Sequence, residues 1–136
     1  MTALTQDRNT LRRDGVQTEP PVAAGARIYG GALVAINAAG FAVPGSTATG
    51  LIGAGVAEQR ADNTGGSAGA IRVRLSRLPH CFGNSTSTDA ITLADVGSDC
   101  YIVDDQTVAK TNGSGTRSRA GRVFDVDGEG VWVDFR

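Results

Sequence analysis

The sequence predicts an all-β domain of short strands over residues 22–136, behind an extended N-terminal arm formed by residues 1–21. Three observations predict this fold class. From residue 26 onward, short apolar runs alternate with turn-forming residues, which is typical of β structure. Glycine makes up 19 of the 136 residues, which favours turns and close backbone contacts over long helices. The first 21 residues hold too few aliphatic side chains to build a core of their own.

The arm has two interpretations, and the sequence leaves both open. It is a disordered tail, or it is a segment that becomes ordered on a neighbouring protein. In the second interpretation, Leu4 and Leu11 are the apolar anchors. Arginines within the same segment would donate hydrogen bonds to the neighbour; they are Arg8, Arg12 and Arg13.

Apolar segments separated by turns predict the strands of the domain. In chain order they are "ARIYGGALVAI", "FAV", "GLIGAGVAE", "AIRVRLSRL", "CYIV", "TVAKT" and the terminal "RVFDVDGEGVWVDFR". The turn "NAAG" separates the first two, and Asp104-Asp105-Gln106 separates "CYIV" from "TVAKT". The one helical candidate is "TLADVG", where Thr92 would cap a single turn and Gly97 would end it.

Residues 71–76 alternate between apolar and polar side chains, which predicts a half-buried strand with a basic outer face. The apolar positions are Ile71, Val73 and Leu75, and the polar positions are Arg72, Arg74 and Ser76. These two arginines and Arg77 would track a phosphate backbone or protect a strand edge from stray pairing. Because Phe82 is the only aromatic residue close to them, they lack the stacking rings of single-strand binders.

The terminal "DVDGEG" resembles the start of a calcium-binding loop, but a hairpin fits it better. Arg136 stands where such a loop needs its bidentate glutamate. Pairing Val126 with Val131 instead leaves Gly128-Glu129 as a two-residue loop, with glycine at the position that a type II′ turn needs. We therefore predict a β-hairpin.

This register predicts one apolar and one acidic face for the hairpin. The apolar face would hold Phe124, Val126, Val131, Val133 and Phe135, and the other face Asp125, Asp127, Trp132 and Asp134. Trp132 would thus lie opposite Asp125, away from the aliphatic residues. Either another part of the domain covers the indole, or Trp132 anchors a partner, since tryptophan is enriched at interfaces.

Composition argues against several classes of partner. A formal net charge of −1 gives no electrostatic reason to expect nucleic acid or an anionic membrane. No apolar run approaches the roughly 18 residues of a membrane span, and no export signal follows Met1. We therefore expect synthesis in a cytoplasm, where Cys81 and Cys100 would be reduced thiols packed as small apolar groups.

Catalytic and metal sites are not predicted. His80 and Cys81 would be the obvious nucleophile pair, but neighbours along a strand point to opposite faces. A zinc site that added Cys100 to them would lack a fourth ligand. The carboxylates of Asp104-Asp105 and of the acidic hairpin face carry no sign of the burial that separates an acid from a base. The sequence thus predicts no catalytic residue, metal or cofactor.

Four stretches together resemble the small capsid cement, or head-decoration, proteins of tailed bacteriophages, especially those of Mu-like transposable phages and related prophages. They are "VAAGARIYGGALVAINAAGFAVPG", "GVAEQRADNTGGSAGAIRVRL", "ADVGSDCYIVDDQTVAKT" and "TRSRAGRVFDVDGEGVWVDF". The likeness runs from about Val22 to Phe135, and "DDQTVAKT" and "GVWV" are its strongest parts. It is interrupted at "RLPHCFGNS", where the family pattern would have a glycine followed by alternating aromatic or aliphatic residues.

The resemblance implies a small β-barrel or β-tulip-like domain that assembles as a homotrimer on the outer surface of the phage head. The partner would be the major capsid protein, at three-fold and quasi-three-fold positions, and the bound protein would stabilise the head against internal DNA pressure. The expected capsid contacts of the arm are Thr5, Arg8, Leu11 and Arg12, and Trp132 is the expected subunit contact. The expected location is the virion, after synthesis in the bacterial host.

A different class of function is the alternative. A free-standing β-barrel would bind carbohydrate or another small ligand, as a host-adhesion module does. Such a module should expose a groove with several aromatic platforms, whereas this chain has one Trp, two Tyr and four Phe. The arrangement of these rings therefore discriminates between the two hypotheses.

Overall fold

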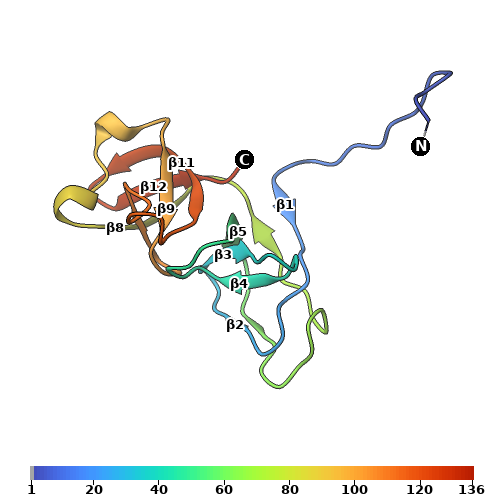
Figure 1. The fold of residues 1–136 in the computed structure, drawn as a ribbon, viewed down its shortest axis with the longest axis horizontal. Coiled ribbons are helices and arrows are strands. Elements are labelled where there is room, and N and C mark those ends of the chain that lie inside the picture. Colours follow the sequence, from blue (N-terminus) through green and yellow to red (C-terminus); the bar gives the residue numbers. More distant parts are fainter. Residues whose placement is uncertain (1) are drawn as a thin grey trace.

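The computed structural model describes residues 2–136 and confirms the all-β class (Figure 1). Two 3₁₀ turns, η1 (Ser87–Asp89) and η2 (Leu93–Asp95), are its helical elements. The predicted turn is η2: Thr92 caps it together with Asp95, and Gly97 follows with a φ of 90°. The η1 turn was not predicted. Among residues 2–136, no helix has the length and apolar character that a membrane crossing requires.

The first half of the chain forms an antiparallel sheet in the order β1-β7-β5-β3-β4. Its strands are β1 (Gln17–Thr18), β3 (Leu33–Ile36), β4 (Ala42–Pro44), β5 (Ile52–Ala57) and β7 (Leu75–Ser76). A smaller antiparallel pair joins β2 (Arg27–Ile28) to β6 (Ala61–Asp62). The β3–β4 hairpin closes at the predicted turn, where the Asn37 side chain accepts hydrogen bonds from the backbone of Ala39 and Phe41, both at 3.0 Å.

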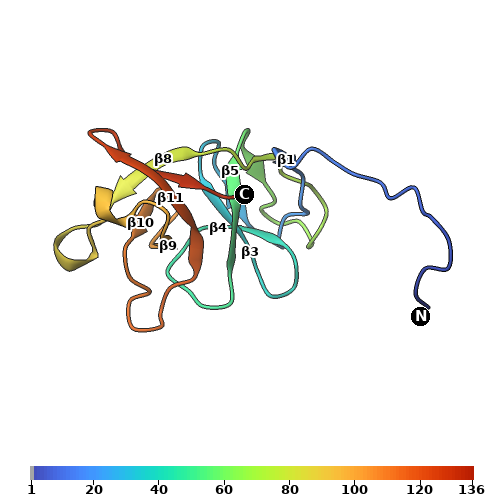
Figure 2. The same cartoon turned by 90° about the horizontal axis from the view of Figure 1, so that it is seen from above.

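The second half closes into a five-stranded barrel in the order β10-β8-β12-β11-β9 (Figure 2). Its strands are β8 (His80–Asn84), β9 (Asp99–Ile102), β10 (Thr107–Ala109), β11 (Arg119–Asp127) and β12 (Gly130–Asp134). The predicted β9–β10 pair is confirmed, with Val108 opposite Ile102. The barrel closes through the one parallel pair among the described strands, β10 with β8.

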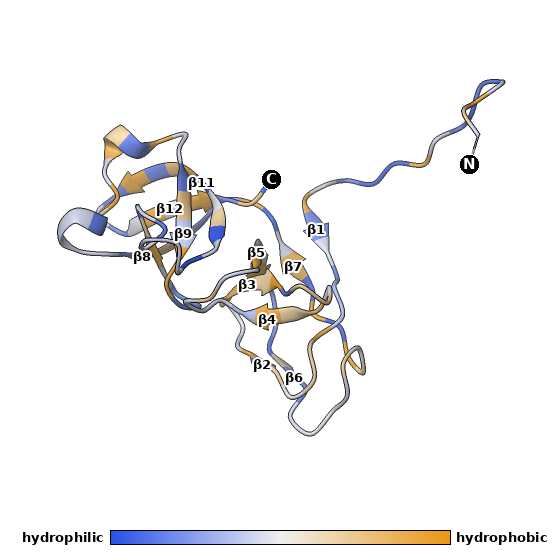
Figure 3. Ribbon diagram, viewed as in Figure 1, coloured by the Kyte–Doolittle hydropathy of each residue, from blue (hydrophilic) through white to orange (hydrophobic). Residues whose placement is uncertain are grey.

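Strand β3 explains how the two halves share their cores. Its alternate residues point to opposite sides, so Leu33 and Ala35 join the apolar cluster of the barrel while Val34 joins a second cluster under β2 and β6. All three are fully buried, because this sheet is covered on both faces at β3. Figure 3 shows the apolar residues concentrated along the strands of the body. The chain therefore has two adjoining cores, and strands β3, β4 and β5 contribute residues to both.

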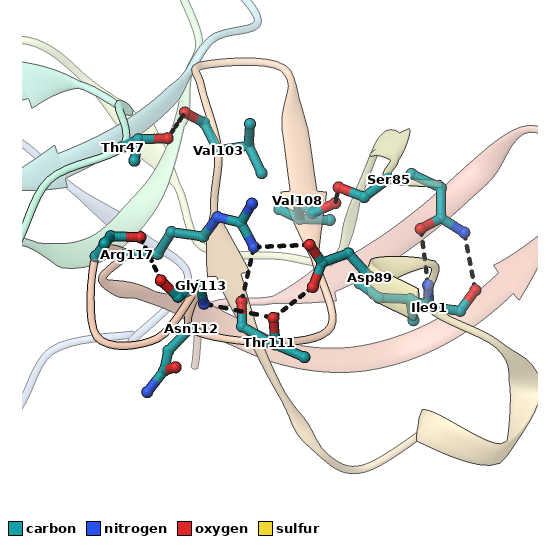
Figure 4. Close-up of polar contacts among 12 residues, drawn as sticks. Thr47, Ser85, Asp89, Ile91, Val103, Val108, Thr111, Asn112, Gly113 and Arg117 are labelled. Atoms are coloured by element: carbon teal, nitrogen blue, oxygen red, sulfur yellow. Dashed lines mark hydrogen bonds and ion pairs between the residues drawn. The ribbon is translucent and has the colours of Figure 1, made fainter. Parts of the chain in front are cut away.

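Polar side chains fasten the long loops of the barrel (Figure 4). Asp89 accepts hydrogen bonds from the Thr111 hydroxyl and from Arg117 Nη1, the latter at 3.3 Å. Asn84 holds the same loop through two bonds with the Ile91 backbone, at 2.8 and 2.9 Å. The Asp89 contacts tie the loop between β8 and β9 to the loop between β10 and β11, and the Asn84 contacts hold the first of these loops to β8.

The terminal hairpin has the predicted pairing of Val126 with Val131, with Gly128-Glu129 as its loop. The predicted type II′ turn is wrong. The positive φ falls at Gly130 (142°) and not at Gly128. A Cβ on Gly130 would lie 2.3 Å from the Phe82 carbonyl oxygen, so close contact with β8 is the reason for glycine there.

The predicted faces of the hairpin are wrong at two positions. A β-bulge between Val123 and Asp125 shifts the register, so Val123 is buried and Phe124 is 56% exposed. Asp134 is buried and not on an open acidic face, and Arg136 donates to its carboxylate at 3.2 Å. The remaining apolar residues of β12 and the terminus are buried as predicted.

The predicted strand at residues 71–76 is shorter than expected. Val73 and Leu75 are buried and the alternating Arg72 and Arg74 are exposed, as predicted. Strand β7, however, covers Leu75–Ser76 alone. Ser76 is buried because it pairs with β1 on one side and β5 on the other. Its hydroxyl accepts a hydrogen bond from the Leu78 backbone at 3.4 Å.

The junction between arm and domain lies earlier than the predicted boundary after residue 21. Strand β1 already belongs to the first sheet, and Pro21 forms a bridge with Arg72. Arg77 donates to the carbonyl oxygen of Gly15 at 3.3 Å. The free part of the arm therefore ends near residue 14, and both views show it leading away from the body (Figures 1 and 2).

Candidate functional site

The arm exposes its apolar side chains. Leu4 is 71% exposed and Leu11 is 88% exposed, and residues 2–14 form no strand or helix. Within the described chain, no hydrogen bond joins residues 2–13 to the folded domain. Full burial of a leucine side chain stabilises a complex by about 1.5–3 kcal/mol. Leu4 and Leu11 could each contribute this free energy when a partner surface covers them.

The other predicted contacts of the arm are also accessible. Thr5, Arg8 and Arg12 are all exposed along the same extended segment as Leu11. An extended backbone offers its N–H and C=O groups together with its side chains, so such a segment can pair with an edge strand as well as fill pockets. The arm therefore combines apolar anchors, cationic donors and a free backbone in one segment.

Trp132 lies on the outer wall of the barrel, half-buried, opposite Asp125 of β11 and Cys81 of β8. Its indole N–H donates to Asp127 at 2.9 Å, so the polar end of the ring is satisfied within its own hairpin. The hairpin thus fixes the ring and leaves part of it open to solvent. Whether a partner covers that part stays a prediction.

The tip of the terminal hairpin is acidic and lacks cations. Asp125, Asp127 and Glu129 are exposed, and none of them forms an ion pair with a described Lys or Arg. Burial raises the pKa of the nearby Cys81 thiol first, and the charges of Asp127 and Glu129 raise it further. The negative charges at the hairpin tip therefore affect the Cys81 side chain on the adjoining strand β8.

The residues considered for catalysis are not brought together. His80 and Cys81 occupy successive positions on β8, and His80 Nδ1 lies 2.7 Å from the Leu78 carbonyl oxygen. Cys100 is fully buried in the barrel, and both cysteines are free thiols. Asp104 caps the β9–β10 turn by accepting from the Gln106 backbone at 2.9 Å. Among residues 2–136, no three potential ligand side chains gather as a metal site would require.

Two shallow hollows lie on the surface, one beside the first sheet and one between the β2–β3 loop and the β9–β10 turn of the barrel, and sequence reasoning missed both. One, of about 160 Å³, is lined chiefly by Glu19, Arg60, Arg72 and Arg74. It could not be predicted because β1 brings Glu19 beside residues more than 50 positions away, where it accepts from Arg74 Nε at 3.0 Å. The alternation of apolar and polar side chains at residues 71–76 was the sequence feature that indicated a basic surface in this region.

The second hollow, of about 330 Å³, is lined by Tyr29, the backbone of the following residues, Asp105 and Gln106. Tyr29 is its one aromatic side chain, and the Arg60 guanidinium lies 5.4 Å from the centre of that ring. Phe124, the other strongly exposed aromatic residue of the described chain, lies on β11 of the barrel. The described surface therefore lacks the row of aromatic platforms that a carbohydrate-binding groove should have.

Comparison of the chain with known families, curated proteins and solved structures finds no match. The family resemblance seen in the sequence therefore stays a prediction. The surfaces of the described chain that are candidates for binding a partner are the free arm, the terminal hairpin and the two hollows.

Proposed function

We propose that the protein is a capsid decoration, or cement, protein of a tailed bacteriophage. It binds the outer surface of the expanded head as a homotrimer at three-fold and quasi-three-fold positions, and it performs no chemistry. The observation that carries the proposal is the free arm, where Leu4 and Leu11 are exposed and make no contact with the domain. Such a segment can become ordered on the surface of a shell, where burial of its leucines would stabilise the complex.

The arm would supply the attachment. Leu11 would enter an apolar depression of the shell, while Arg8 and Arg12 donate to carboxylates or carbonyl oxygens beside it. Ordering the extended chain costs backbone entropy, about 1–2 kcal/mol per residue, so one arm binds weakly by itself. Attachment through three linked arms overcomes this weakness, because the second and third arms bind at a high effective concentration.

The mechanism of stabilisation is geometric. A trimer that spans a three-fold position contacts several capsid subunits at once, so separating these subunits also requires breaking its contacts. The β domain suits this role because its two cores and its fastened loops make a stiff body. Internal DNA pressure would then act against the shell and its decoration together.

Removal of the arm tests the attachment. We expect a chain that lacks residues 2–14 to fold, since no hydrogen bond joins residues 2–13 to the domain, and to bind expanded heads at least about tenfold more weakly. The measurement is capsid occupancy after sedimentation of heads with increasing protein.

A pair of matched variants sharpens the test. The double substitution Leu11→Ser with Arg12→Ser should weaken binding, whereas Gln6→Ser with Asn9→Ser, in the same exposed segment, should leave it unchanged. Occupancy that is equal for the truncated and complete chains would overturn the role of the arm.

A further inference from the structure

The hollow beside β1 and β7 carries an excess of positive charge. Arg60, Arg72 and Arg74 line it, with Glu19 as its one carboxylate. The Arg74–Glu19 pair is about half exposed on both sides, and Arg60 lies 3.8 Å from Asp62 with most of its side chain in solvent. Exposed pairs of this kind contribute about 0–1 kcal/mol, so these arginines can exchange partners at small cost.

The opposite charge gathers at the tip of the terminal hairpin. Asp125, Asp127 and Glu129 carry three negative charges there without an ion pair among the described residues. The tip is a two-residue loop, Gly128-Glu129, and is therefore narrow enough to enter a shallow depression. Glu129 stands at its outermost turn, with an exposed side chain.

The tip and the hollow cannot meet within one molecule. The hairpin ends on the far side of the barrel, whereas β1, β6 and β7 lie at the opposite side of the body (Figures 1 and 3). The hollow belongs to the first sheet and the tip to the barrel, and these two units are joined through β3, β4 and β5. A second copy of the chain offers each of these surfaces one of opposite charge.

We propose that copies of this chain associate head to tail, with the acidic hairpin tip of one copy seated in the arginine-lined hollow of the next. A contact between two different surfaces closes into a ring when the rotation between copies allows it. Such a ring would be the subunit interface of the proposed homotrimer, and the inference depends on that proposal for the number of copies alone. Trp132, beside Asp127, would lie at the edge of this contact.

A charge exchange tests the contact. Glu129→Lys alone and Arg74→Glu alone should each weaken self-association by about tenfold, because each places like charges face to face. The double variant, which exchanges the charges, should return to within about threefold of the original chain. The measurement is the mass distribution in sedimentation equilibrium over a range of protein concentrations.

The chain offers a matched control. Arg119 pairs with Asp99 at similar exposure, 53% and 50%, to the 51% of both Arg74 and Glu19, but it lies outside both surfaces. Arg119→Glu should therefore associate like the original chain. Glu129→Gln, on an exposed turn, weakens association without reversing a charge and so guards against a folding defect in the lysine variant.

A chain that remains monomeric at all concentrations would overturn the proposal, as would single variants that associate like the original chain. The truncation of residues 2–14 leaves both surfaces intact, so that chain should associate normally even when it fails to bind heads. An original chain that binds heads but does not self-associate would contradict the interface and leave the decoration role standing.

Discussion

The two cysteines differ in their surroundings and should differ in reactivity. Cys100 is fully buried in the barrel, and this burial raises its pKa to about 11. Cys81 is half-buried, and burial and the hairpin carboxylates raise its pKa as well. Because the thiolate is the nucleophile, both thiols should react slowly near neutral pH.

We therefore expect iodoacetamide at pH 8 to modify Cys81 slowly and to leave Cys100 unmodified until the chain unfolds. Intact-mass spectrometry would show one adduct on the native protein and two in denaturant. Modification of Cys100 at the rate of Cys81 would contradict its place inside the barrel.

Asp89 links stability to pH. The hydrogen bond from Thr111 lowers its pKa, and the bond and charge of Arg117 lower it further. The folded pKa is thus below that of the unfolded chain, so the stabilisation is complete above about pH 4 and is lost as pH falls through the folded pKa. Asp89→Asn should therefore reduce the free energy of unfolding at neutral pH and flatten its decrease below about pH 4.

Denaturant titrations at several pH values would measure this difference. Asp7→Asn is the control, because Asp7 lies in the free arm and makes no contact with the domain. A profile for Asp89→Asn that runs parallel to that of the original chain would show that the loop network does not depend on this carboxylate.

Strand β5 passes so close to β11 that one of its positions requires glycine. A Cβ on Gly53 would lie 1.9 Å from the Ala120 carbonyl oxygen, which is backbone and cannot move aside. Gly53→Ala should therefore destabilise the domain by about 3 kcal/mol through overpacking at the junction of the two halves.

Gly128→Ala is the matched control, because nothing lies within 4 Å of its added Cβ. It should change the free energy of unfolding by less than about 0.5 kcal/mol. Equal thermal midpoints for the two alanine variants would show that β5 and β11 are not in close contact.

The sequence predicts local strand pairing well because that pairing depends on nearby residues. A two-residue loop and period-two alternation were enough to place Val126 opposite Val131. The bulge beside Phe124 could not be predicted, because it depends on a distant segment. The backbone of Val123 bonds with Gly97 and Ser98, at 2.8 and 2.9 Å, and this pairing turns Phe124 outward.

The candidate surfaces also divide into those with a local sequence signal and those that depend on contacts between distant segments. The arm was evident from composition, since few aliphatic residues stand among charged and polar ones. The arginine-lined hollow was not, because β1 pairs with β7 across almost 60 positions and brings Glu19 to Arg72 and Arg74. Closure of the barrel through the parallel β8–β10 pair is likewise a long-range event without a local signal.

At the scale of the whole molecule, the chain divides into a body and a free segment. The body buries two adjoining apolar clusters, whereas the arm leaves Leu4 and Leu11 in solvent. An extended segment with exposed apolar side chains and a free backbone is suited to becoming ordered on a partner surface. In the proposed trimer, the bodies contact one another and the arms contact the shell.

The central claim is that this chain decorates the head of a tailed phage, and electron microscopy of purified virions that carry the chain tests it most directly. We predict protruding density over the three-fold and quasi-three-fold positions of the head, with three β domains in each protrusion and three arms extended along the shell. Heads that lack such density in the presence of the protein, or density for single domains elsewhere on the particle, would contradict the proposed function.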